Sequence, residues 1–200
     1  MKFDRIFVSF IFIFCLLMIP ASSGLADAKT DGDKGIEEYR NGNLIEAMYL
    51  LEKSALKGYI PAQITLAHIL DKAEQNSEAF HWYQQAAKNK DAAGLFGLGG
   101  MYAKGEGTPA DPPKAGQLIK QSALLGHLPA MRAYAYALEH GQLGFSQNNS
   151  AAVEWFIKAA NSGDKVSMRR LRNAYTLGQL GMPVDPEQAS KWDAEINMEN

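Results

Sequence analysis

The chain has 200 residues, of which 46% are apolar and 21% are charged, so it can build one domain core or a small repeat array. Its formal net charge is −2, and its Lys and Arg residues form no basic block or stripe. This excludes the electrostatic footprint of a nucleic-acid-binding protein, and no nucleic-acid partner is expected.

The first 28 residues have the order of a secretory signal peptide. Lys2 and Arg5 precede an apolar run over residues 6–19, and small residues then lead to an Ala-x-Ala pattern that ends at Ala28. These are the three parts of such a peptide. A membrane-spanning helix needs about 20 apolar residues. Cleavage after Ala26 or Ala28 is therefore favoured, and a retained membrane anchor is the alternative.

Residues 29–200 are then expected to form the mature domain, and the protein is expected to be periplasmic or secreted. The single cysteine, Cys15, lies inside the apolar run and follows Phe14 rather than the small residue that lipid attachment would require. A mature chain without Cys15 has no thiol. Disulfide bonds, cysteine nucleophiles and thiolate metal sites are therefore excluded together.

From about residue 35 the sequence repeats at a period of 32 to 37 residues. One series pairs an alanine with a large residue three positions later, and a second series has apolar or small residues four apart. Steps of three and four trace one face of a helix. Each repeat is therefore predicted to be a pair of antiparallel helices that bury their apolar faces only by stacking. The first series is Ala47/Leu50, Ala79/Trp82, Ala115/Leu118, Ala152/Trp155 and Ala189/Trp192; the second is Ala62/Leu66/Leu70, Gly94/Leu98/Tyr102, Ala130/Tyr134/Leu138 and Ser167/Leu171/Tyr175.

The glycine-rich stretch GLGGMYAKGEGTPADP, residues 97–112, raises the question of a phosphate-binding loop. Gly100 and Gly105 have the spacing of such a loop, but no Lys-Ser or Lys-Thr follows and no strand is predicted before them. Gly105 recurs as Gly141 and Gly178, where a left-handed glycine typically ends a helix. We interpret the stretch as a helix followed by a turn, with the earlier glycines allowing close approach of a neighbouring helix.

Two segments resemble the Sel1-like repeat, a relative of the tetratricopeptide repeat. They are LGGMYAKGEGTPADPPKAGQLIKQSALLG, residues 98–126, and AVEWFIKAANSG, residues 152–163. The resemblance covers residues 35–196. It implies an all-α fold, a right-handed superhelical α-solenoid of antiparallel helix pairs whose first helices line a concave surface. About four repeats are expected, with a first pair closer to an ordinary tetratricopeptide unit and a last helix that stops early.

The same resemblance implies an adaptor that binds a protein or peptide partner. Secreted bacterial members of the family are tied to envelope assembly, polysaccharide export or host contact, so an exported scaffold of the cell envelope is expected. Some cysteine-rich relatives bind penicillin or hydrolyse β-lactams, but each of their repeats contains a disulfide bond. This mature chain lacks such bonds. An envelope enzyme acting on cell wall or β-lactam is therefore kept as the alternative.

No catalytic group, cofactor or metal site is predicted, since the four histidines stand in no ligand spacing and no nucleophile motif is present. By resemblance, the candidate binding residues are those of the first helices that face the concave side. Their mixture of cations, aromatic rings and amides suits an extended peptide with acidic or carboxylate character, and a plain solvated surface is the alternative. These residues are His68, Asp71, Phe96, Arg132, Tyr136, Glu139, Arg169 and Asn173.

Arg132, Tyr136 and Arg169 are the expected anchors of this surface. Arg169 follows Arg132 by one repeat, so the two guanidinium groups are expected side by side, held there for an acidic group of the partner. Tyr134 and Leu138 already supply the apolar face of that helix. The sequence therefore predicts that the fold does not need Arg132.

Overall fold

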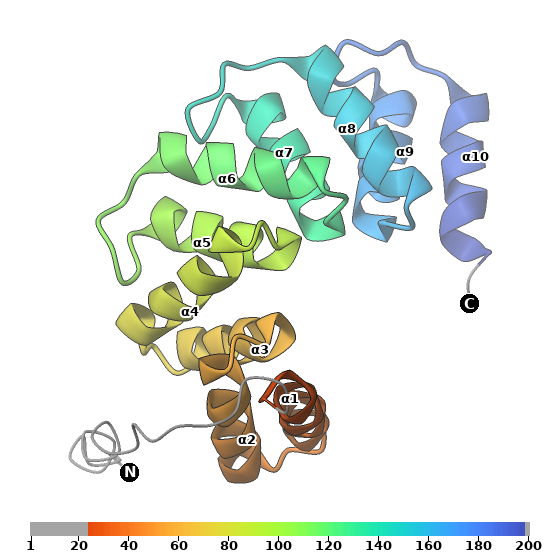
Figure 1. Ribbon diagram of the computed structural model, residues 1–200. Coiled ribbons are helices and arrows are strands. Elements are labelled where there is room, and N and C mark those ends of the chain that lie inside the picture. The colour runs from red at the N-terminus through yellow and green to blue at the C-terminus, as the bar shows by residue number, and fades with distance from the viewer. Residues whose placement is uncertain (1–23, 199–200) are drawn as a thin grey trace, which may run out of the picture.

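The computed structural model describes residues 24–198, and these residues form ten α-helices (Figure 1). Most of the expected signal peptide, including Cys15, lies outside the described residues. The bounds are α1 Gly24–Arg40, α2 Leu44–Leu56, α3 Ile60–Lys72, α4 Asn76–Lys88, α5 Ala92–Lys104, α6 Pro112–Leu124, α7 Leu128–His140, α8 Asn149–Asn161, α9 Lys165–Leu177 and α10 Pro186–Asn197.

Consecutive helices form five antiparallel pairs, and the pairs stack into an arc. The odd-numbered helices α3, α5, α7 and α9 lie on the inner side of this arc, and α2, α4, α6 and α8 lie on the outer side (Figure 1). The expected all-α fold, a right-handed superhelical α-solenoid, is confirmed. The last helix, α10, has 12 residues where its counterparts have 13, so it is nearly complete.

Helix α1 begins at Gly24, ahead of the expected start of the mature domain at residue 29. Within it, Ala28 is buried, and its backbone carbonyl accepts a hydrogen bond of 2.5 Å from the Ser54 hydroxyl of α2. Ser122 makes the same contact to the carbonyl of Ala92 within its own repeat. Ala28 therefore occupies the position in the first helix pair, α1 and α2, that Ala92 occupies in the pair of α5 and α6.

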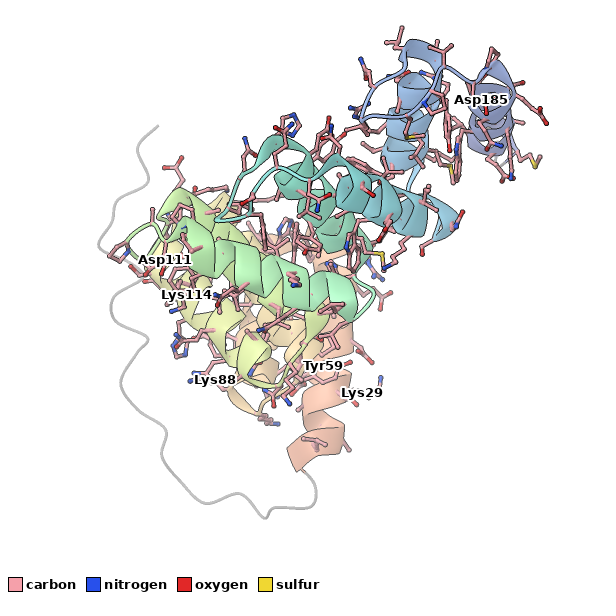
Figure 2. The ribbon with its side chains drawn as sticks, turned by 90° about the horizontal axis from the view of Figure 1, so that it is seen from above. Lys29, Tyr59, Lys88, Asp111, Lys114 and Asp185 are labelled. Atoms are coloured by element: carbon pink, nitrogen blue, oxygen red, sulfur yellow. The ribbon has the colours of Figure 1, made fainter. Side chains whose placement is uncertain are left out.

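Acidic or amide side chains set the start of five helices. Asp91, Asp111, Asn148, Asp164 and Asp185 each accept a hydrogen bond from the backbone N–H three residues later, at 2.9–3.0 Å. Figure 2 shows Asp111 beside Lys114 at the start of α6, and Asp185 at the start of α10. Each cap of this kind stabilises a helix by about 1 kcal/mol.

Glycines end the inner helices α5, α7 and α9, and glycines inside α5 allow it to pack closely on its neighbours. Gly105 has the predicted left-handed conformation, with φ of 79°. Inside α5, a side chain at Gly97 would collide with the ring of Tyr83, and one at Gly99 would come within 2.9 Å of Ile119. The predicted close approach is therefore confirmed at these two positions. It is wrong for Gly100, where a Cβ would meet open space.

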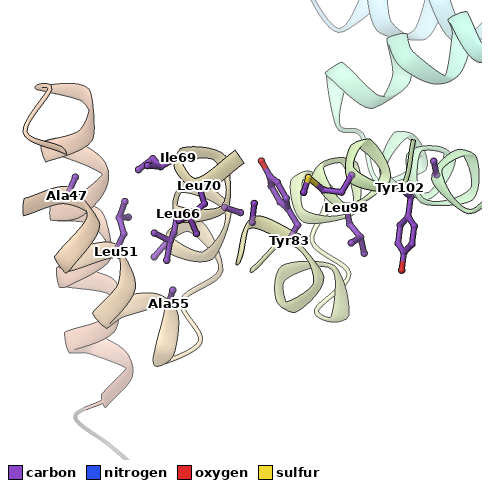
Figure 3. Packing of buried hydrophobic residues seen from close by; sticks show 14 residues of the cluster. Ala47, Leu51, Ala55, Leu66, Ile69, Leu70, Tyr83, Leu98 and Tyr102 are labelled. Atoms are coloured by element: carbon purple, nitrogen blue, oxygen red, sulfur yellow. The ribbon is translucent and has the colours of Figure 1, made fainter. Parts of the chain in front are cut away.

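The core runs along the middle of the stack in two clusters. In the first, Leu51 of α2 packs towards Leu66 and Leu70 of α3, and Tyr83 and Leu98 continue the cluster into the next pairs (Figure 3). The second cluster surrounds the fully buried Phe156 and Leu171. Burying each such side chain contributes about 1.5–3 kcal/mol. The predicted core positions of the three tryptophans are confirmed, because Trp82, Trp155 and Trp192 are half-buried against these clusters.

Candidate partner-binding surface

The eight predicted binding residues lie on four inner helices of the arc (Figure 1). They occupy the fifth, ninth and twelfth positions of these 13-residue helices, which lie on one helical face. His68 and Asp71 are on α3 and Phe96 is on α5; Arg132, Tyr136 and Glu139 are on α7, and Arg169 and Asn173 are on α9. The structure divides this row into side chains used by the fold and side chains that face solvent.

Arg132 belongs to the first group. Its guanidinium contacts the Asp164 carboxylate at 2.5 Å, and this carboxylate is only 7% exposed. Asp164 also accepts hydrogen bonds from the backbone N–H and the hydroxyl of Ser167, so it caps α9. The prediction that the fold does not need Arg132 is wrong, because Arg132 neutralises a buried cap in the next repeat. Its charge therefore requires no acidic partner group.

Glu139 is also used by the fold. Its carboxylate accepts hydrogen bonds from the Arg170 guanidinium, the shortest of 2.6 Å, and both side chains are largely buried. The pair links α7 to α9, the next inner helix. Sequence reasoning missed Arg170 because it selected its neighbour Arg169 for the inner face. Adjacent residues point about 100° apart on a helix, so Arg170 faces α7 when Arg169 faces solvent.

The aromatic members are half-buried packing residues. The ring of Phe96 meets that of His127 edge-on, with centroids 5.1 Å apart, and Tyr136 meets Phe156 in the same way at 5.0 Å. Burial of the His127 ring lowers its pKa, in spite of the nearby Asp91 charge. Only part of each aromatic ring in the row is therefore open to a partner.

Asp71 is half-buried near Tyr83 of the paired outer helix. Burial raises the pKa of Tyr83 to about 12, and the negative charge of Asp71 adds to this shift. Asp71 therefore acts on a core tyrosine as well as contributing a carboxylate to the inner side.

His68, Arg169 and Asn173 are the exposed members of the row. Within residues 24–198, neither His68 nor Arg169 forms an ion pair, and Asn173 accepts hydrogen bonds from Arg172 through Oδ1. Gly100 occupies the ninth position of α5 between them, and open space lies where its side chain would be. The solvent-facing part of the row therefore offers an imidazole, a guanidinium, an amide and a gap.

Two further properties bear on the kind of site. Over residues 24–198, His, Cys, Asp and Glu nowhere gather in a group of three or more that could hold a metal ion. In the same range, each helix is too short or too polar to cross a membrane.

Five stacked helix pairs with a regular inner face define an α-solenoid scaffold of the tetratricopeptide-like class, a fold suited to protein–protein interaction. A model of the Sel1 repeat matches residues 21–59, 71–91, 92–127, 128–164 and 168–192. The chain belongs to the Sel1 repeat family. This family is a non-catalytic repeat scaffold, and the match gives five repeats where the sequence suggested about four.

Two curated relatives are fungal regulators. The chain is 32% identical over 135 residues to a chitin synthase regulator of Saccharomyces cerevisiae, across 64% of this chain and 19% of the yeast protein. It is 25% identical over 173 residues to chitin synthase regulatory factor 3 of Schizosaccharomyces pombe, across 82% of this chain and 18% of that protein. The chain thus spans less than a fifth of the length of either relative.

Solved structures of bacterial proteins share the fold. A Sel1 repeat protein from Oxalobacter formigenes is 25% identical with a TM-score of 0.79, and the alignment covers 86% of this chain and 72% of that one. A protective antigen of uropathogenic Escherichia coli is 24% identical with a TM-score of 0.74, over 84% of this chain and 38% of that one.

Proposed function

We propose that this protein is an exported scaffold that holds an extended segment of a partner protein against its inner helices. The observation that carries the proposal is the solvent-facing part of the inner row. Arg169 and His68 offer donors, Asn173 offers an amide, and Gly100 leaves a gap for a side chain of the partner. Helical solenoids present such rows along their curved surfaces.

The partner segment is expected to carry an acidic or terminal carboxylate where it meets Arg169. Arg169 is exposed and is bound to no carboxylate in the described residues. A guanidinium can bind a carboxylate through two parallel hydrogen bonds. Arg132 is no longer an anchor of this proposal, since Asp164 already occupies it.

The fungal relatives suggest which partners to test first. Both are named as regulators of chitin synthase, an enzyme of polysaccharide synthesis. We therefore propose that the partner is a protein of the cell envelope, with enzymes of polysaccharide synthesis as the first candidates.

Export is part of this proposal and rests on the first 28 residues. Cleavage after Ala26 would leave the buried Ala28 and its hydrogen bond to Ser54 in the mature protein, which supports this position over cleavage after Ala28. Mass spectrometry of the protein from its host should find Asp27 as the first residue. A mature chain beginning at Met1 would contradict export by cleavage.

Affinity capture from envelope extracts tests the binding surface. The double substitution Arg169→Ala, Asn173→Ala should reduce capture of the main partner at least about tenfold, because a charge-assisted hydrogen bond contributes about 1.5–3 kcal/mol. Glu154→Ala on outer helix α8 is the matched control and should capture the partner like the wild type. Equal capture by the double variant would refute the proposed surface.

A further inference from the structure

The turn between α1 and α2 contains Asn41-Gly42, the only place in the chain where glycine follows asparagine. Both residues are exposed. Gly42 has φ of 84°, in the left-handed region, and a Cβ added to it would meet no atom within 4 Å. The backbone and the side chain at this step of the turn are therefore open to water.

A following glycine makes an asparagine chemically unstable. The side-chain carbon Cγ of an asparagine can bond to the backbone nitrogen of the next residue, because this closes a five-membered ring. A side chain on that next residue hinders the approach, and Gly42 has none. A hydrogen bond can also hold the amide, as at Asn89, which donates from Nδ2 to the carbonyl of Gln85 at 3.0 Å. Within residues 24–198 the Asn41 side chain makes no such bond.

The turn between α4 and α5 provides a matched comparison. Asn89 there precedes Lys90, whose φ of 57° lies in the same left-handed region as that of Gly42. The N–H of Lys90 donates to the carbonyl of Ala87 at 2.9 Å. The N–H of Gly42 donates to the carbonyl of Tyr39 at 3.2 Å. The two backbones thus turn in the same way, and the longer bond holds the Gly42 nitrogen less firmly.

We propose that Asn41 is a deamidation site, which converts slowly to aspartate and isoaspartate. Helix ends fray, and fraying at the end of α1 releases the Gly42 nitrogen from its hydrogen bond. This nitrogen loses its proton and bonds to Cγ of Asn41, and the side-chain nitrogen leaves as ammonia. Water then opens the resulting succinimide ring at either C–N bond. One opening restores the normal backbone with an aspartate, and the other routes the backbone through Cβ, which gives isoaspartate.

The modification alters the first helix pair, which forms one end of the arc (Figure 1). Either product adds a negative charge three residues after Glu38. Isoaspartate also lengthens the turn, across which the N–H of Asn43 donates to the carbonyl of Glu38 at 2.9 Å. The site lies on none of the inner helices α3, α5, α7 and α9, so deamidation does not touch the surface of the proposed function.

Peptide mapping by mass spectrometry tests the site in the purified protein, in the form that the cell produces. The protein is incubated at mildly alkaline pH, because the attacking nitrogen must lose its proton, and a synthetic peptide of residues 39–44 is incubated beside it. Asn41 should be replaced by both acidic products while Asn89 remains intact, and an isoaspartyl methyltransferase should label the isoaspartate product. An Asn41 that is still intact when the peptide has fully reacted, or loss of Asn89 at the same rate, would overturn the proposal.

The substitution Gly42→Lys separates the chemistry from the structure of the turn. It installs the residue type that already adopts this conformation at Lys90, and its side chain would meet open space. The variant should remain folded by circular dichroism and should retain Asn41 over the time in which the wild type loses it. Gly58→Lys is the matched control, since Gly58 has φ of 85° and the same open surroundings but follows no asparagine; it should lose Asn41 like the wild type. Loss of Asn41 from the Gly42→Lys variant at the wild-type rate would contradict the proposed route.

Discussion

At the scale of single residues, the charged side chains of the inner row have more than one use. Arg132 and Glu139 hold neighbouring repeats together, whereas Arg169 faces solvent. The sequence correctly placed all three residues on one helical face. It could not show that Asp164 contacts Arg132 or that Arg170 contacts Glu139. Those contacts depend on how each pair is rotated against the next, and a helical period carries no information about that rotation.

Replacing Arg132 should separate the structural role from the binding role. Arg132→Ala leaves the Asp164 carboxylate buried without its counter-charge, and should lower the free energy of unfolding by about 1–3 kcal/mol. Arg169→Ala should change it by less than about 0.5 kcal/mol, because Arg169 is exposed. Chemical denaturation measures both, and equal stability of the two variants would contradict the role given to Arg132.

Tyr83 should make stability depend on alkaline pH. Burial raises its pKa to about 12 in the folded protein, whereas the unfolded chain ionises near about 10. Below pH about 10 both states hold the proton, so the stabilisation is complete. As the pH rises from about 10 to about 12, the unfolded state loses its proton first, and stability falls by roughly 2–3 kcal/mol.

Tyr83→Phe removes this ionisable group. The free energy of unfolding of the variant should therefore fall less than that of the wild type over the same pH range. Urea denaturation at several pH values from about 9 to about 11.5 compares the two proteins. Parallel losses in the two proteins would show that Tyr83 does not ionise differently in the folded and unfolded states.

At the scale of elements, helix type and pairing could be predicted but individual close contacts could not. Ala47, Ala79 and Ala115 recur once in each repeat, and each lies at a fully buried position of an outer helix. The glycines of α5 were assigned one role, yet Gly97 and Gly99 contact neighbouring helices while Gly100 faces open space. The sequence could not distinguish these three glycines, because their surroundings depend on which side of α5 packs against α4 and α6.

Two alanine substitutions in α5 should therefore have opposite effects. Gly100→Ala should stabilise the protein by up to about 1 kcal/mol, because alanine favours the helix and its methyl group meets no neighbour. Gly97→Ala should destabilise it by about 1–3 kcal/mol, because the methyl group would overlap the buried Tyr83 ring. Thermal melting of both variants checks the signs, and two shifts in the same direction would contradict the packing described for α5.

At the scale of the whole molecule, the five pairs form one curved stack with different inner and outer surfaces. The repeat period gave the stacking, and the Sel1 resemblance gave the inner helices, so the architecture followed from the sequence. The placement of the loops did not, because residues 105–111 pack on α4 and residues 141–148 pack on α6, and these are contacts between neighbouring repeats. Contacts between repeats therefore decide which surfaces are free for partners.

Site-specific photocrosslinking in the native host tests the central claim, that the inner side of the arc holds a partner protein. The crosslinking amino acid is placed at His68 or Arg169 on the inner helices, and at the exposed Gln117 or Glu154 on the outer helices. The account predicts that both inner positions crosslink to one and the same partner protein and that the outer positions do not. Crosslinks to that partner from the outer positions alone would contradict it.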